Sequence, residues 1–118
     1  MEKITPEQQK KTKIQKIVEE TLEMLKRLEE NGKISILEEE KIKEKIEEMF
    51  KKESEKNFEK ERSFWEAYVS VKEFLEAAIK ENLLKIQGIN EEEIEANRQI
   101  LIELFRRNIY KFRTYKEI

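Results

Sequence analysis

The sequence predicts an all-α protein built from two helical hairpins, about four helices in all, that form an elongated bundle. Three observations lead to this prediction. The 118 residues include only two glycines and one proline, and β turns depend on residues of this kind. Apolar residues recur every three to four positions in four stretches, which is the spacing of one face of a helix. Helix-capping residues stand between these stretches.

The first helix is predicted to begin at Pro6. Thr5 suits the N-cap, proline suits the first helical position, and Gln8 completes a capping box. Asn31 and Gly32 are expected to end the helix, since glycine readily adopts the left-handed conformation of a C-cap. The apolar stripe of this helix consists of Ile14, Ile17, Val18, Leu22, Met24, Leu25 and Leu28.

The second helix is predicted to start at another capping box, formed by Ser35 and Glu38. It completes a first hairpin that spans residues 6–50. Its apolar side consists of Ile42, Ile46, Met49 and Phe50.

The third and fourth helices form the second predicted hairpin, residues 64–114. Gly88 is expected to end the third helix, and Asn90 to cap the fourth together with Glu93. The isoleucine that follows each glycine turn, Ile34 or Ile89, is expected to pack back on the preceding helix. The third stripe consists of Phe64, Tyr68, Val71, Leu75, Ile79 and Ile86, and the fourth of Ile94, Leu101, Leu104, Phe105 and Phe112.

The segment between the hairpins, residues 51–62, leaves two arrangements open. It has neither Gly nor Pro and is rich in Glu and Lys, which are good helix formers. In one arrangement a continuous helix runs from 36 to 87, about 78 Å long at 1.5 Å per residue. In the other, Ser63 and Glu66 cap a new helix and the bundle is compact. Both arrangements make residues 1–118 a single domain.

The composition excludes several kinds of chemistry. The chain has no cysteine and no histidine, and all 27 acidic residues are glutamate. Disulfides, zinc fingers and histidine-activated nucleophiles are therefore ruled out. Glu-x-x-Glu pairs, which can hold divalent cations, occur four times, below the roughly six that chance predicts for this glutamate frequency. We expect no enzymatic activity, no cofactor, no bound metal and no small-molecule substrate.

Positive charge is concentrated near the C-terminus. The formal net charge is −2, yet residues 96–118 hold six lysines and arginines against two glutamates. A flank of the fourth helix alternates arginine and isoleucine: Arg98, Ile102, Arg106, Ile109 and Arg113. Arginine suits interfaces and phosphate groups, and tyrosines can stack on bases or side chains. The candidate binding surface consists of this flank with Arg107, Tyr110, Lys111, Tyr115 and Lys116.

A structural interpretation of the same flank stays open. In this interpretation the arginines pair with glutamates of a neighbouring helix, and Ile102 and Ile109 complete the core. Three asparagines lie on or beside the apolar stripes: Asn82, Asn97 and Asn108. Each also allows two interpretations. A polar residue at a helix seam can fix the register of the helices, whereas one at the edge of a stripe contacts water.

The function expected from these features is a non-catalytic helical interaction or assembly module. We expect it to form a homodimer resembling a coiled coil, to bind another protein, or both, because its apolar stripes need cover. The alternative is a small helical subunit that binds RNA or single-stranded nucleic acid through its C-terminal helix. No apolar run approaches the about 20 residues of a membrane-spanning helix. The N-terminus shows no signal-peptide segment, so we expect a cytoplasmic protein without a membrane partner. The abundance of Glu, Lys and Ile is typical of a heat-adapted or AT-rich source.

Overall fold

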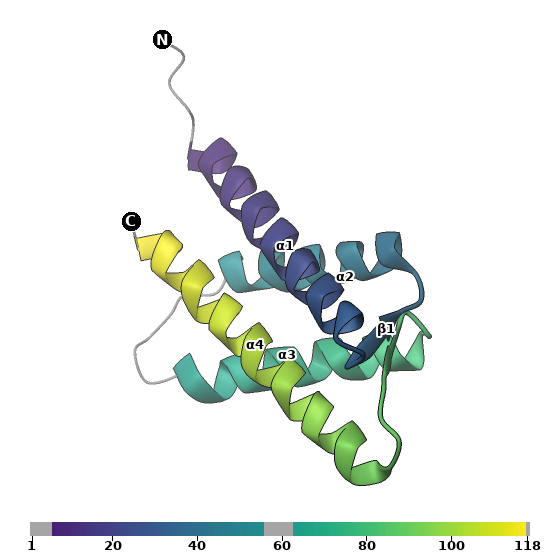
Figure 1. Cartoon of the computed structure of the whole chain (residues 1–118). Helices are drawn as coiled ribbons and strands as arrows, with labels where there is room; N and C mark the ends of the chain where they lie inside the picture. The colour runs from purple at the N-terminus through teal and green to yellow at the C-terminus, as the bar shows by residue number, and fades with distance from the viewer. Residues whose placement is uncertain (1–5, 56–62, 118) are drawn as a thin grey trace.

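The computed structural model describes residues 6–55 and 63–117, with side-chain contacts for residues 13–55 and 66–113. The predicted all-α class is confirmed, with the addition of two short strands. The expected N-cap Thr5 lies outside the described residues. The elements in chain order are α1 (Pro6–Glu30), β1 (Ile34–Ile36), α2 (Glu39–Glu55), α3 (Ser63–Lys80), β2 (Leu84–Ile86) and α4 (Glu91–Glu117) (Figure 1).

The helices form two layers. Figure 1 shows α1 and α4 side by side in front, with α2 crossing behind α1 and α3 crossing behind α4. The front pair is antiparallel. Lys111 Nζ on α4 lies 2.9 Å from Glu20 Oε2 on α1, and Asn108 donates a hydrogen bond to Thr21 Oγ1 one turn further along (3.0 Å). The polar contacts of this seam therefore join two helices from opposite ends of the chain.

The rear pair decides between the two arrangements left open for helices two and three. Lys45 Nζ on α2 lies 2.8 Å from Glu81 Oε2 just beyond α3, and Ser70 on α3 donates to Glu53 Oε1 on α2 (2.9 Å). On one straight helix Lys45 and Glu81 would be about 54 Å apart. The continuous helix from 36 to 87 is therefore wrong, and α2 and α3 fold back on each other. The connection itself, residues 56–62, lies outside the described residues.

A single core receives side chains from all four helices. The ring centroids of Phe50 on α2 and Phe112 on α4 are 5.2 Å apart, and those of Phe74 on α3 and Phe105 on α4 are 4.8 Å apart. Much of each stripe expected to need cover from a second chain is buried within this one, and other members, such as Leu22, Ile79 and Leu104, are partly buried against the same core. Fully enclosed members include Ile17, Leu25, Ile42, Ile46, Val71 and Leu101.

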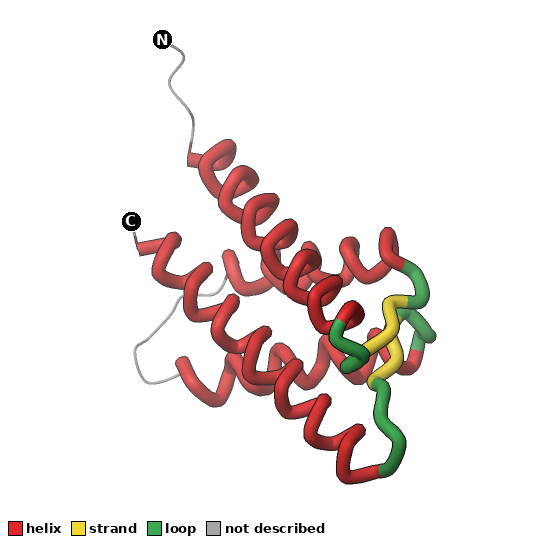
Figure 2. The backbone as a smooth tube through the Cα atoms, viewed as in Figure 1, coloured by secondary structure: helices red, strands yellow, loops and turns green. Residues whose placement is uncertain are grey.

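The two strands pair as a short antiparallel ribbon at the end of the bundle where α1 and α3 stop (Figure 2). In its register Ser35 faces Lys85, and backbone hydrogen bonds extend the pairing one step beyond each strand. Ser35 therefore lies in β1, and the predicted capping box that it would form with Glu38 is wrong. Instead α2 begins at Glu39, and the Glu38 carbonyl accepts the first helical hydrogen bond, from the Ile42 N–H (3.0 Å).

The ends of α1 and α3 share one hydrogen-bond pattern. Beyond α1, Gly32 adopts a φ of +72° and its N–H donates to the Glu29 carbonyl, as predicted for a glycine C-cap. Beyond α3, Asn82 plays the same part with a φ of +57°, donating to the Ile79 carbonyl. The prediction that Gly88 ends the third helix is wrong, because Asn82 stops the helix and releases the next residues into β2.

The start of α4 is partly as predicted. Asn90 Oδ1 accepts a hydrogen bond from the Glu93 N–H (2.9 Å), which confirms the N-cap. Ile34 is buried as expected, but Ile89 is 89% exposed, so its predicted packing is wrong. The Gly88 backbone lies against Ile94 of α4: a Cβ on Gly88 would lie 2.6 Å from Ile94 Cγ1.

Candidate functional site

The alternating flank of α4 lies largely inside the bundle. Ile102 and Ile109 belong to the hydrophobic core, and Arg113 is only 8% exposed. The cause is the position of α4, which contacts the other three helices and β2, so that its buried arc is wide. These three side chains are enclosed by their own chain and are not available on its exterior.

The other described cations of this surface lie close to carboxylates. The N–O distances are 3.5 Å for Arg98–Glu95, 3.4 Å for Arg106–Glu103, 3.7 Å for Arg107–Glu103 and 2.9 Å for Lys111–Glu20. Such surface pairs add about 0–1 kcal/mol of stability each. They also reduce the positive charge that a nucleic-acid backbone would meet. The structural interpretation is thus only partly as expected, because Arg98 and Arg106 pair within α4 and not with a neighbouring helix. Arg113 does approach a glutamate of another helix, Glu53 of α2, at 3.5 Å.

The aromatic members of the surface add one contact. Tyr110 is half-buried, and the guanidinium carbon of Arg113 lies 5.6 Å from the centroid of its ring, within the range of a cation–π interaction. One side of the Tyr110 ring is thus occupied by a residue of the same helix. The side chains of Tyr115 and Lys116 lie outside the described part of the chain.

The three asparagines occupy three different settings. Asn108 lies at the seam of α1 and α4, where it donates to Thr21 Oγ1. Asn97 is buried and donates to the Gln87 carbonyl (2.7 Å), which ties α4 to the residue after β2. Asn82 is exposed and terminates α3, so it lies at no helix seam.

A buried polar contact that the sequence prediction missed joins α2, α3 and α4. Glu53 is fully buried, and its carboxylate accepts a hydrogen bond from Ser70 and lies 3.5 Å from Arg113 Nη2. The signal was present in the sequence: Glu53 follows Met49 by four positions and Phe50 by three, which places it on the apolar stripe of α2. Arg113 reaches the carboxylate of Glu53 because α4 packs against α2.

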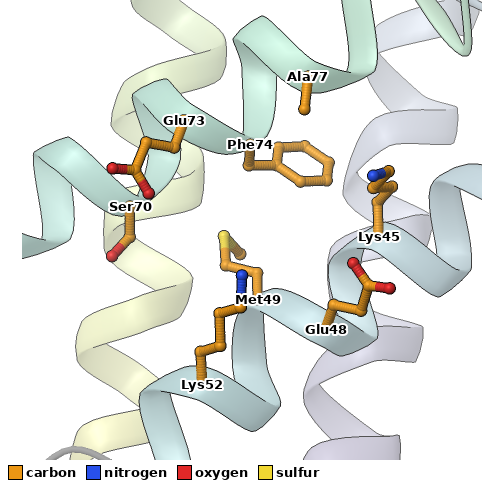
Figure 3. Close-up of a pocket in the computed structure, with 8 residues that line it drawn as sticks. All are labelled: Lys45, Glu48, Met49, Lys52, Ser70, Glu73, Phe74 and Ala77. Carbon is orange, nitrogen blue, oxygen red and sulfur yellow. The ribbon is translucent and has the colours of Figure 1, made fainter. Parts of the chain in front are cut away.

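A groove lies between α2 and α3 on the outer face of the rear layer (Figure 3). Met49 and Phe74 form its floor, and its volume is about 150 Å³. Figure 3 shows Lys45 and Lys52 along the α2 side, and Ser70, Glu73 and Ala77 along the α3 side. Both floor residues belong to the core, so the groove reaches the edge of the hydrophobic interior.

The two walls of the groove carry different charges. Lys45, Glu48 and Lys52 line it from α2, whereas Glu73 is the charged residue that α3 contributes. A hydrogen bond to Glu81 raises the pKa of Lys45 above its ordinary value, and the negative charges of Glu81 and Glu48 add to this shift. An apolar floor between charged walls can hold an apolar side chain and orient its charged neighbours. The sequence prediction missed this groove because its walls come from two helices.

Two further hollows lie among the described residues. One, of about 450 Å³, lies beside the ribbon and is lined by Glu29, Ser35 and Gln87 among others, and the other, of about 290 Å³, lies between α1 and α2. Of the exposed large apolar residues, Leu37 lies between β1 and α2, Ile89 lies between β2 and α4, and Ile100 lies on α4. Within residues 6–55 and 63–117 no three potential ligands converge to hold a metal ion. In the same part of the chain no helix is both long and apolar enough to cross a membrane.

Comparisons of this chain with models of known protein families, with characterised proteins and with solved structures give no match.

Proposed function

We propose that the chain is a non-catalytic protein-interaction module that binds its partner along the groove between α2 and α3. The observation that carries this proposal is the make-up of the groove: an apolar floor of Met49 and Phe74 between charged walls. Protein interfaces commonly combine a small apolar centre with a polar rim. Met49 adds adaptability, because its unbranched thioether side chain can adjust to different neighbours.

The size of the groove favours a protein partner over a small ligand. Pockets that enclose small molecules measure about 300–1,000 Å³, whereas this groove measures about 150 Å³. A space of this size is too small to enclose such a ligand and suits an apolar contact with another protein surface. The lysines and glutamates beside the floor would then meet charged groups that flank this contact.

Filling the groove tests the proposal. Ala77 is half-buried in the α3 wall, so Ala77→Arg places a long side chain over the groove without removing a core residue. The matched control is Ala96→Arg, the same substitution at an exposed position of α4. Circular dichroism and thermal melting should show that both variants keep the fold.

The readout is the set of proteins captured by the tagged full-length chain in its own host, quantified by mass spectrometry. Wild type and Ala96→Arg should capture the same proteins. Ala77→Arg should reduce that capture about tenfold or more, the effect of losing a central contact of an interface. Equal capture by all three forms, or no capture by wild type beyond the tag alone, would refute the proposal.

A further inference from the structure

The two sides of the α2–α3 groove differ in their net charge. Residues three and four positions apart share a helix side, and this spacing extends each wall beyond the groove itself. The α2 rim consists of Lys41, Lys45, Glu48 and Lys52, and the α3 rim of Glu66, Ser70, Glu73, Ala77 and, one residue past the helix, Glu81. The α2 rim is therefore basic, with three lysines and one glutamate, whereas the α3 rim holds three glutamates, with Lys80 beside it three positions past Ala77.

Some of these charged residues form ion pairs within the chain, whereas others do not. Lys45 pairs with Glu81, and Lys41 lies 3.4 Å from Glu38. Lys52 and Glu73, at the other end of the groove, are exposed, and neither makes an ion pair or hydrogen bond with another described residue. One exposed cation and one exposed anion thus flank the groove at nearly the same level, on opposite walls (Figure 3).

The antiparallel packing of α2 and α3 makes this pattern self-complementary. The contacts Lys45–Glu81 and Glu53–Ser70 define which residues of the two helices lie level with each other, and by this register Lys52 lies level with Glu73. A twofold axis that runs along the groove places α2 of one copy on α3 of another and keeps each residue at its level. Lys52 of each copy then meets Glu73 of the second copy.

Another twofold, which crosses the groove, gives the opposite result. It places α2 on α2, so that lysine rims meet lysine rims and glutamate rims meet glutamate rims. Like charges in direct opposition disfavour that arrangement. The charge pattern therefore selects the axis along the groove, which also creates the same ion pair twice, as a closed twofold interface requires.

We infer that the partner which occupies the groove is a second copy of this chain, docked by the twofold along α2 and α3. This inference rests on the proposed function, because it uses the same groove. The apolar floor formed by Met49 and Phe74 becomes the centre of the dimer, and the paired rims fix the relative orientation of the two copies.

Charge reversal at the two exposed residues tests the inference. The full-length chain, Lys52→Glu, Glu73→Lys and the double variant are compared by sedimentation equilibrium at low salt. Each single variant opposes like charges twice and should weaken dimerisation about tenfold or more. The double variant, and an equal mixture of the two single variants, restore opposite charges at both contacts and should recover dimerisation near the wild-type level.

The possible outcomes separate this inference from the proposed function. A wild-type chain that stays monomeric overturns the second copy as partner, and the capture experiment with Ala77→Arg then decides the proposed function alone. A dimer that both single variants leave unchanged overturns the twofold docking. Weakening in both single variants without recovery in their mixture also overturns it, because that result denies the contact between Lys52 and Glu73.

Discussion

Removal of one partner from the buried pair of Glu53 and Arg113 should destabilise the protein strongly. Breaking such a pair costs about 3–5 kcal/mol, because the remaining charge stays buried without compensation. For Glu53→Leu we expect a loss of about 3 kcal/mol, the lower end of this range. The side chain of Arg113 keeps 9% exposure and a contact with Tyr110, which ease the burial of its charge. For Arg113→Met we expect about 4 kcal/mol, because Glu53 is fully buried.

The double variant Glu53→Leu with Arg113→Met separates the charge effect from packing. Replacing both members of a buried pair by apolar residues of similar size is often neutral, so we expect a loss of about 1 kcal/mol or less. The coupling between the two sites should then amount to several kcal/mol. A matched control is Glu47→Leu, which removes one member of an exposed pair with Lys51 (3.2 Å) and should cost about 0–1 kcal/mol.

Urea unfolding, followed by the circular dichroism of the helices, measures these free energies. With a slope of about 1.5 kcal/mol per molar urea, a loss of about 3 kcal/mol lowers the midpoint by about 2 M. The midpoint of the double variant should return close to that of wild type. If the double variant loses the sum of the two single losses, Glu53 and Arg113 are not coupled, and the buried pair does not join the three helices as described.

Two further predictions concern glycine and pH. Gly88→Ala should lower the free energy of unfolding in urea by about 2 kcal/mol, because the added Cβ would lie 2.7 Å from the backbone nitrogen of Ile94. The Cβ of Gly32→Ala meets open space, and this variant should lose about 1 kcal/mol through its positive φ. Equal losses of free energy in the two variants would contradict the prediction. Since Glu81 raises the pKa of Lys45, the stability from their pair is complete below the ordinary lysine pKa and is lost as the pH rises through the raised one. When the pH is raised from about 9 to about 11, the melting temperature of Lys45→Met should therefore fall by less than that of wild type. An identical fall in both proteins would contradict the raised pKa of Lys45.

The helical core was the part of the fold that the sequence predicted well. Ile17, Leu25, Ile46 and Leu101 are all fully buried, as their spacing predicted. This success has a physical reason: the side of a helix that faces the core is set by local spacing, and the apolar stripes of this chain are long and regular. The Asn90 cap was predictable for the same reason, since it depends on residues three positions apart.

The ribbon was not predictable from local sequence. Ile34-Ser35-Ile36 and Leu84-Lys85-Ile86 alternate apolar and polar residues, but a triplet of this kind fits a strand or the edge of a helix equally well. Its conformation is decided by a partner 50 positions away in the chain. The choice of Asn82 over Gly88 as the end of α3 follows from this pairing, because asparagine tolerates the left-handed conformation and an earlier stop frees the residues that form β2.

The candidate surface on α4 shows a different limit. A helical wheel gives the flanks of an isolated helix and leaves open how many neighbours that helix has. Ile102, Ile109 and Arg113 are buried because α4 is covered by three helices. The α2–α3 groove was missed for the complementary reason, since Lys52 and Glu73 lie on facing walls only when two helices fold back on each other.

The groove between α2 and α3 is held at both of its ends, which links stability to the proposed interaction. At the end near the ribbon, Lys45 pairs with Glu81; at the other end, the buried carboxylate of Glu53 joins Ser70 and Arg113. Ser70 also lines the groove. A change at Glu53 should therefore alter the spacing of the two rims as well as the free energy of unfolding. Lys52 and Glu73 can match a second copy only while this spacing is kept, so the Glu53→Leu variant should dimerise less than wild type even under conditions where it is fully folded.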